Sequence, residues 1–253
     1  EIIDSGHGYA RGKYKKYKKC KKYKKYNKYI KYMEYIEKTE YKMNKLFPGI
    51  FAMATIVVAS NILVQFFIGN WLTWGAFTYP FAFLVTDLIN RMYGPADARR
   101  VVFFGFVVGI LCSLIGTQIN IEIAPDFMAP AVTLRIAIGS ATAFLCAQLL
   151  DVTIFDRLRH GTWWSAPLIS TLIGSTLDTI LFFFISFSFM MTSLLGSDHN
   201  IDFFNEIVMG PLGFEQTRWI ATAMVDWSVK VSIALIALIP FRLIIIAYHA
   251  RNN

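Results

Sequence analysis

The sequence predicts an all-α membrane protein, a six-transmembrane-helix bundle with its N- and C-termini in the cytosol. Three observations lead to this prediction. Apolar runs of about 20 residues, long enough to cross a hydrocarbon core, recur along residues 46–250. Basic and acidic charge alternate in the connections between these runs. Small residues recur at every fourth position within several runs, a spacing typical of closely packed membrane helices.

The N-terminal segment 1–45 differs in composition from the rest of the chain. Residues 1–47 hold 15 of the 25 basic and 5 of the 17 acidic residues, so the net charge of +8 belongs to this end. Residues 10–32 are low-complexity Lys and Tyr. They suit an arm that binds nucleic acid or anionic lipid, or a stretch translated upstream of a natural start at Met43. We expect a disordered or non-native tail, followed by a single six-helix domain at 46–250.

Six apolar segments are the expected transmembrane helices. Their approximate bounds are 46–68, 72–92, 99–117, 132–155, 163–191 and 219–248. The last two exceed the minimal length, so we expect them to be tilted or to have interfacial ends. Between them, residues 201–209 read as a short amphipathic helix on the outer face.

The charge of the connections sets the predicted orientation. The connections at 91–100 and 157–159 are basic, as are both ends of the chain, whereas the connection at 196–218 has four acids and one arginine. Short basic loops stay on the cytosolic side of a membrane. Every connection agrees with this rule, and both termini are therefore predicted to be cytosolic.

Charged side chains lie inside the last two segments, where a carboxylate at the bilayer centre costs about 2.5–3.5 kcal/mol. Asp178 is the deepest. Asp226 and Lys230 are four residues apart, so they share a helix face and can neutralise each other, either as a structural pair or as part of a proton relay. Small residues lead along one helix face into Asp151 and into Asp178, so we expect these two acids to face protein and not lipid.

Further polar side chains lie in the first, second and fourth segments: Asn61, Asp87, Asn90, Gln148 and Asp151. For Asp87 and Asp151 the sequence leaves two interpretations open: a functional acid, or an interfacial acid paired with Arg99, Arg100, Arg157 or Arg159. Arg135 begins the fourth segment at the outer face, where a side chain that snorkels to the interface would account for it.

The motifs favour transport over catalysis. The sequence has no P-loop, GxSxG, HExxH or paired CxxC motif, and its three cysteines and four histidines are scattered. We therefore predict no enzyme activity, no cofactor and no metal site. A selective channel would show rings of repeated charge or a carbonyl filter. A small-molecule transporter, with acids that bind substrate or carry protons, fits the composition best.

Two long stretches are recognisable. Residues 78–102 read TYPFAFLVTDLINRMYGPADARRVV, and residues 134–183 include AQLLDVTIFDRLRHG and STLIGSTLDT. With AMVDWSVKV at 223–231, they resemble the signature of the queuosine precursor transporter family, also called the vitamin uptake transporter family, over about residues 43–242. In this sequence Arg91 stands where many members have an acid, and Ser-Ala-Pro at 165–167 replaces an Arg-Asn version.

The resemblance implies a secondary-type transporter in the bacterial cytoplasmic (inner) membrane that imports 7-cyano-7-deazaguanine and 7-aminomethyl-7-deazaguanine, the precursors of queuosine in tRNA. The substrate-binding positions that it implies are Asn61, Asp87, Asn90, Gln148, Asp151 and Asp178. A guanine-like edge presents a ring N–H beside an amine, which one carboxylate can accept together. We expect Asp178 to read this edge, with Asn61 and Gln148 nearby.

The expected partners are a purine-like substrate, the lipid bilayer and, as a coupling ion, protons; no nucleic acid is expected. Two alternatives stay open. One is the substrate-binding subunit of an energy-coupling-factor vitamin importer, although the Ala-x-x-x-Ala motif usual in the first helix of such subunits is missing here. The other is a membrane anchor without transport.

Overall fold

A computed structural model describes residues 5–64, 66–124 and 127–252 of the chain. The chain divides into two compact units, Glu1–Phe47 and Pro48–Asn253. Helix α1 (Ser5–Leu63) extends through both units and contains Pro48. Residues 5–45 are thus helical where the sequence predicted a disordered or non-native tail, in line with the high helix propensity of Lys. The role and origin of this tail stay predictions.

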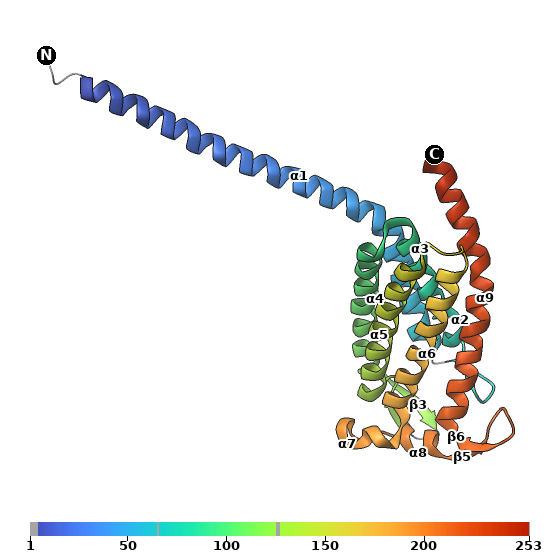
Figure 1. Cartoon of the computed structure of the whole chain (residues 1–253). Helices are drawn as coiled ribbons and strands as arrows, with labels where there is room; N and C mark the ends of the chain where they lie inside the picture. Colours follow the sequence, from blue (N-terminus) through green and yellow to red (C-terminus); the bar gives the residue numbers. More distant parts are fainter. Residues whose placement is uncertain (1–4, 65, 125–126, 253) are drawn as a thin grey trace. The chain divides into compact units, whose positions relative to one another are not determined.

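The second unit is a bundle of long helices that lie side by side (Figure 1). Its long helices after α1 are α4 (Pro95–Gly116), α5 (Leu134–Leu158), α6 (Ser165–Phe187) and α9 (Arg218–Asn252). Within the described part of the chain, five helical segments are long and apolar enough to cross a membrane: Met43–Leu63, α4, α5, α6 and Arg218–Arg251. The predicted helical membrane protein is confirmed at this level.

The predicted continuous helix over 72–92 is wrong, because the backbone there is broken. Strands β1 (Phe67–Ile68) and β2 (Leu72–Thr73) pair as a small ribbon. They are followed by α2 (Gly75–Thr78) and α3 (Phe81–Tyr93). Pro80 stands immediately before α3, and its ring and missing N–H favour an interruption at this point. With 13 residues, α3 is about 20 Å long, which is less than the roughly 30 Å of a hydrocarbon core.

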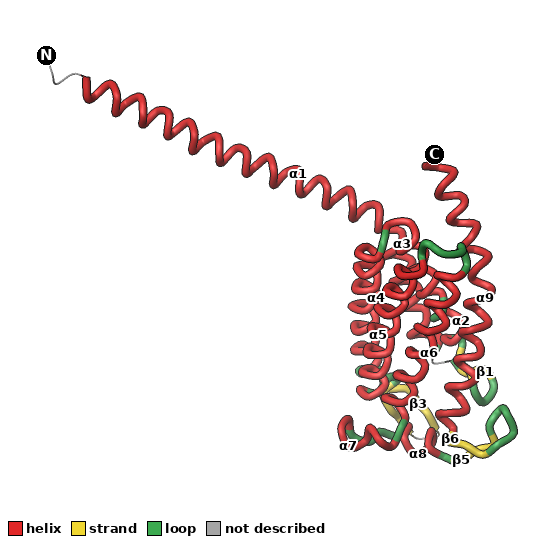
Figure 2. The backbone as a smooth tube through the Cα atoms, viewed as in Figure 1, coloured by secondary structure: helices red, strands yellow, loops and turns green. Residues whose placement is uncertain are grey.

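Short elements connect the long helices at one end of the bundle (Figure 2). Strands β3 (Asn120–Ala124) and β4 (Phe127–Pro130) form one antiparallel ribbon, with Ile121 opposite Ala129. Strands β5 (Ile207–Met209) and β6 (Glu215–Thr217) form another, with Val208 opposite Gln216. Between α6 and β5 lie η1 (Phe189–Met191), α7 (Thr192–Leu195) and α8 (Asn200–Asn205). The predicted helix over 201–209 therefore ends at Asn205, and that over 163–191 ends at Phe187.

Helices α5 and α6 approach each other closely through small residues. A Cβ placed on Gly174 of α6 would lie 2.9 Å from the Phe83 ring and 3.3 Å from Asp151 Cβ. A Cβ on Gly139 of α5 would overlap the Ser186 hydroxyl. The small faces that lead to Asp151 and Asp178 are buried, and the two acids are 0% and 4% exposed. The prediction that both acids face protein is confirmed.

Candidate functional site

Asp178, near the middle of α6, belongs to a cluster of charged and hydroxyl side chains. Lys230 of α9 places its Nζ 2.8 Å from Asp178 Oδ2 and 2.6 Å from Asp226 Oδ2. Tyr79 donates its hydroxyl to the other Asp178 oxygen at 2.9 Å. Thr179 accepts from Lys230 Nζ at 3.1 Å and donates to Asp226 at 3.2 Å. We call these five residues the charge cluster.

The charge cluster is almost closed to solvent. The side chains of Asp178 and Lys230 are each 5% exposed, and that of Asp226 is 14% exposed. Because one lysine serves two acids, the cluster has a formal charge of −1 when all three groups are ionised. Removing one partner of a buried ion pair costs about 3–5 kcal/mol, since it leaves an uncompensated charge. We therefore expect the loss of any one charged member to destabilise the cluster. Its net negative charge favours a ligand that brings positive charge or hydrogen-bond donors.

Tyr79 reaches Asp178 from the break between α2 and α3. Its backbone N–H closes α2 on Gly75 O at 3.0 Å, and Pro80 follows. The Tyr79 ring packs edge-on against Phe83 and Phe144, with centroid distances of 6.3 and 6.2 Å. Membrane transporters commonly place substrate and ion sites where a helix is interrupted near the bilayer midplane. The break thus brings a polar hydroxyl to the central acid.

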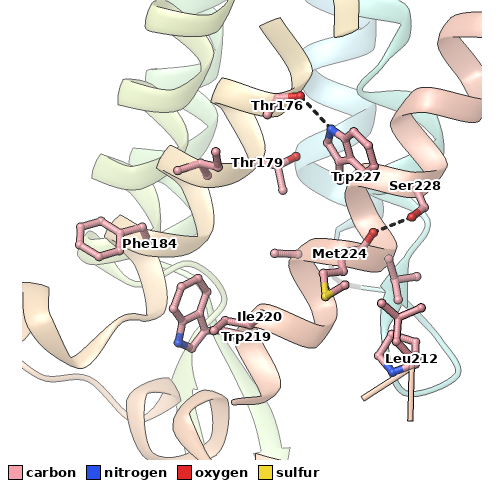
Figure 3. Close-up of a pocket in the computed structure, with 13 residues that line it drawn as sticks. Thr176, Thr179, Phe184, Leu212, Trp219, Ile220, Met224, Trp227 and Ser228 are labelled. Atoms are coloured by element: carbon pink, nitrogen blue, oxygen red, sulfur yellow. Dashed lines mark hydrogen bonds between the residues drawn. The ribbon is translucent and has the colours of Figure 1, made fainter. Parts of the chain in front are cut away.

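A pocket of about 670 Å³ lies between α6 and α9 beside the charge cluster (Figure 3). Its aromatic lining comes from Phe184, Trp219 and Trp227. Thr179 lines the pocket and also contacts Lys230 and Asp226, so it joins the pocket to the charge cluster. Thr176 accepts a hydrogen bond from the Trp227 indole at 2.9 Å. The volume falls within the roughly 300–1,000 Å³ of small-molecule sites.

A second polar group lies where α3, α5 and α6 meet, and we call it the carboxylate pair, Asp87 with Asp151. Asp87 is 2% exposed and accepts from Ser170 at 3.3 Å and Thr171 at 3.2 Å. Asp151 is fully buried, interacts directly with Asp87, and has no hydrogen-bond partner for either oxygen. Among the described residues, the two Asp151 oxygens are therefore the atoms of the pair that lack a hydrogen-bond donor.

Two buried amides flank the carboxylate pair. Gln148 accepts from Thr86 at 2.6 Å, and its Nε2 has no partner. Asn90 donates to Val152 O at 3.0 Å, and its Oδ1 has no partner. Gln148 thus lies one turn before Asp151 on α5 and is bonded to Thr86, the residue before Asp87, while its expected place near Asp178 stays a prediction. Asn61, also expected there, donates to Val57 O of its own helix at 2.8 Å.

The arginines near the helix ends do not form ion pairs with Asp87 and Asp151. In the described residues, Arg100 pairs with Asp97 at 2.8 Å and Arg159 with Asp156 at 3.0 Å, and no ion pair reaches Asp87 or Asp151. Of the two interpretations that the sequence left open for these acids, pairing with Arg99, Arg100, Arg157 or Arg159 is therefore not found. Both acids lie about two turns from the ends of their helices, and Arg159 instead binds Asp156 and Asn90 O.

Arg135 does not snorkel to the interface either. It is 3% exposed and donates to Ile185 O at 2.9 Å and Gly196 O at 3.0 Å, to the Thr192 hydroxyl at 3.1 Å, and to Ser188 O. It binds carbonyls at the end of α6 and at the end of α7, where helix carbonyls lack a partner within their own helix. Its role is structural, and its five donors suit it.

Tyr79 and Thr179 are the site residues that the sequence analysis did not single out. Thr179 directly follows the predicted acid Asp178, and Tyr79 directly precedes the helix-breaking Pro80. A hydroxyl residue at a predicted helix break inside an apolar segment is the signal that would have indicated Tyr79. No local pattern connects either residue with Lys230, because that contact joins separate helices.

Apolar helices that bury two polar groups, with an open pocket of small-molecule size beside one of them, are typical of a multi-pass membrane protein of the transporter class. The family model described as "Putative vitamin uptake transporter" matches residues 73–245. The "Queuosine precursor transporter" of Escherichia coli strain K12 is 35% identical over 194 residues, 73% of this chain and 79% of the relative. The chain therefore belongs to the queuosine precursor transporter family and is a multi-pass protein of the bacterial inner membrane.

Two further relatives cover shorter stretches. A "Probable queuosine precursor transporter" of Haemophilus influenzae is 42% identical over 124 residues, 46% of this chain and 52% of the relative. One of the same description from Bacillus subtilis is 29% identical over 128 residues, 46% of this chain and 56% of the relative. No solved structure matches the chain.

Proposed function

We propose that the protein imports queuosine precursors, 7-cyano-7-deazaguanine and 7-aminomethyl-7-deazaguanine, across the inner membrane as a secondary transporter. The names of its curated relatives support transport of queuosine precursors. The observation that carries the proposal is the pocket between α6 and α9, which reaches a buried anionic cluster through Thr179.

The chemistry of a 7-deazaguanine base suits this arrangement. Its flat ring can stack on the indoles of Trp219 and Trp227, since aromatic stacking on a base contributes about 1–3 kcal/mol. Its ring N–H and exocyclic amine are adjacent donors that match a carboxylate. In the proposed bound state this edge lies at Thr179 and competes with Lys230 for Asp178 and Asp226. The 7-aminomethyl relative adds a cation, which the net charge of the cluster favours.

The six predicted substrate residues lie in three places. Asp178 keeps the proposed role of reading the base, together with Tyr79 that holds it. Asp87 and Asp151 form the carboxylate pair, Asn90 and Gln148 flank it, and none of the four lines the pocket. Asn61 has its amide nitrogen engaged within α1, and it stays a proposed contributor at the edge of the substrate path.

For topology, we propose six crossings, in which α2 and α3 together form the second. Both termini are then on one side, the cytosolic side according to the basic residues of the adjoining connections. The pocket begins near Trp219, at the end of α9 that adjoins the ribbon of β5 and β6. On this topology the pocket lies toward the outside of the cell, as an importer requires.

The test is uptake of labelled 7-cyano-7-deazaguanine by cells that cannot synthesise it, with and without this chain. The proposal predicts uptake that depends on the chain and is lost in Asp178→Asn. The matched control is Asp202→Asn, because Asp202 is exposed on α8 and outside the pocket. Equal uptake by Asp178→Asn and wild type, at equal amounts in the membrane, would exclude Asp178 from recognition.

The energy-coupling-factor alternative makes a different prediction. A substrate-binding subunit would need its partner proteins for transport, whereas a secondary transporter works alone. The curated relatives carry transporter names and do not favour the alternative. Transport by the purified chain alone in liposomes separates the two.

A further inference from the structure

The carboxylate pair is the second polar group in the membrane, and the proposed substrate site leaves it without a role. Both acids are almost fully buried, Asp87 at 2% and Asp151 at 0% exposure. Asp87 receives two hydroxyl donors, from Ser170 and Thr171. Neither Asp151 oxygen has a donor in hydrogen-bond geometry, although Ser170 and Asp87 lie close beside it. Two buried carboxylates side by side cannot both be ionised without a large cost, so a positive particle must accompany them.

The surrounding elements do not supply that positive charge as an ion pair. On α3, Arg91 interacts with Asp87 through its charge but forms no ion pair with it; one guanidinium nitrogen donates to Arg159 O at 2.5 Å, and Nη2 is buried without a hydrogen-bond partner. On α4, the Asp97 carboxylate binds Arg100. Three other cations near these helices are engaged. Lys230 of α9 belongs to the charge cluster, and Arg242 of α9 stacks on Trp163. Arg159, at the C-terminal end of α5, binds Asp156. Helix α6 contributes only hydroxyls to the pair.

The packing around the carboxylate pair favours a very small ligand. Gly174 already lies so close that an added Cβ would be 3.3 Å from Asp151 Cβ and 2.9 Å from Phe83. Gln148, Asn90 and Thr86 close the group from α5 and α3, each at 0% exposure. A base has no room here in this conformation, whereas a proton on Asp151 that is donated to Asp87 would satisfy both acids.

The carboxylate pair is also mechanically connected to the charge cluster. Helix α6 carries Ser170 and Asp178 eight residues apart, about 12 Å along the axis. Helix α3 carries Asp87, and the break before it holds Tyr79, which binds Asp178. A movement of α3 against α6 would therefore change both groups at once, which is what coupling between substrate and ion requires.

We propose that Asp87 and Asp151 form the proton-binding site that couples precursor import to the proton gradient. This inference rests on the proposed function. The proton binds between the two carboxylates from the outer side, is carried as the substrate site changes its access, and leaves to the cytosol. No bond other than that to the proton forms or breaks.

The test uses the purified full chain in liposomes that contain a trapped pH indicator. With wild type, addition of external 7-cyano-7-deazaguanine should acidify the interior, and an inward proton gradient should drive accumulation of labelled precursor. If wild type transports the precursor without proton entry, or follows a sodium gradient instead, the inference is overturned. This measurement needs no variant, so it does not depend on whether a variant folds.

The variant Asp151→Asn then locates the site. Accumulation driven by the gradient should fall to the level of protein-free liposomes, while exchange of labelled for unlabelled precursor continues. Asp156→Asn is the control on the same helix, since Asp156 is partly exposed and pairs with Arg159. Unchanged accumulation by Asp151→Asn would overturn the assignment. Absence of exchange by wild type would instead contradict the proposed function itself.

Discussion

Replacing Lys230 with Met should destabilise the protein more than any single neutralisation of its partners. Lys230 is the shared cation of two acids, at 2.8 Å from Asp178 and 2.6 Å from Asp226. Its removal leaves two buried carboxylates without a counter-charge, whereas Asp178→Asn leaves Lys230 paired with Asp226. Loss of one partner of a buried pair costs about 3–5 kcal/mol. For a chain of this size that corresponds to a fall in Tm of roughly 6–20 °C.

The assay is thermal unfolding of the detergent-purified protein, followed by the fraction that stays monodisperse after heating. We expect the order of stability to be wild type, then Asp178→Asn, then Lys230→Met, and we expect the double variant Lys230→Met with Asp178→Asn to recover part of the loss. Non-additivity of this kind is what a shared ion pair produces. If Lys230→Met melts together with wild type, the reasoning about the charge cluster is wrong.

Three further predictions concern single contacts. Tyr79→Phe removes the hydroxyl that donates to Asp178 at 2.9 Å, and it should weaken precursor binding, measured by titration, by roughly tenfold. Tyr32→Phe in the exposed tail should bind the precursor as wild type does. Equal affinities of Tyr79→Phe and wild type for the precursor would contradict the proposed site. Gly174→Ala should lower the free energy of unfolding by about 1–3 kcal/mol, because the new methyl would lie 2.9 Å from the Phe83 ring. The control Gly109→Ala, whose new methyl would have its nearest contact at 3.4 Å, should unfold near the wild-type temperature. Arg135→Lys should lower the unfolding temperature, since an ammonium group cannot reach the four acceptors that the guanidinium binds; an unchanged temperature would show that these contacts are not needed.

The sequence predicted the long helices well because hydrophobic length is a local property. The bounds expected for the third, fourth and sixth segments agree with α4, α5 and α9 to within a few residues. The second segment was misread because apolar composition alone does not show a break. Pro80 was the available signal, and its position between α2 and α3 explains why the segment is two pieces.

The members of the two polar groups were mostly predicted, but their grouping was not. Asp226 and Lys230 were expected to pair because four residues separate them on one helix, and they do. Asp178 joins them, and Gln148 binds Thr86, the residue before Asp87. Which helix faces which is decided by packing between segments far apart in the chain, and the spacing of residues within one helix has no information on it.

The central claim is that this chain moves 7-deazaguanine bases through the pocket beside Asp178. The most direct measurement is exchange of labelled 7-cyano-7-deazaguanine across liposomes that contain only the purified protein, wild type or Asp178→Asn. The account predicts saturable exchange with wild type, competition by the 7-aminomethyl base, and little exchange with Asp178→Asn. Exchange no faster than in protein-free liposomes, or equal exchange by the two proteins, would contradict it.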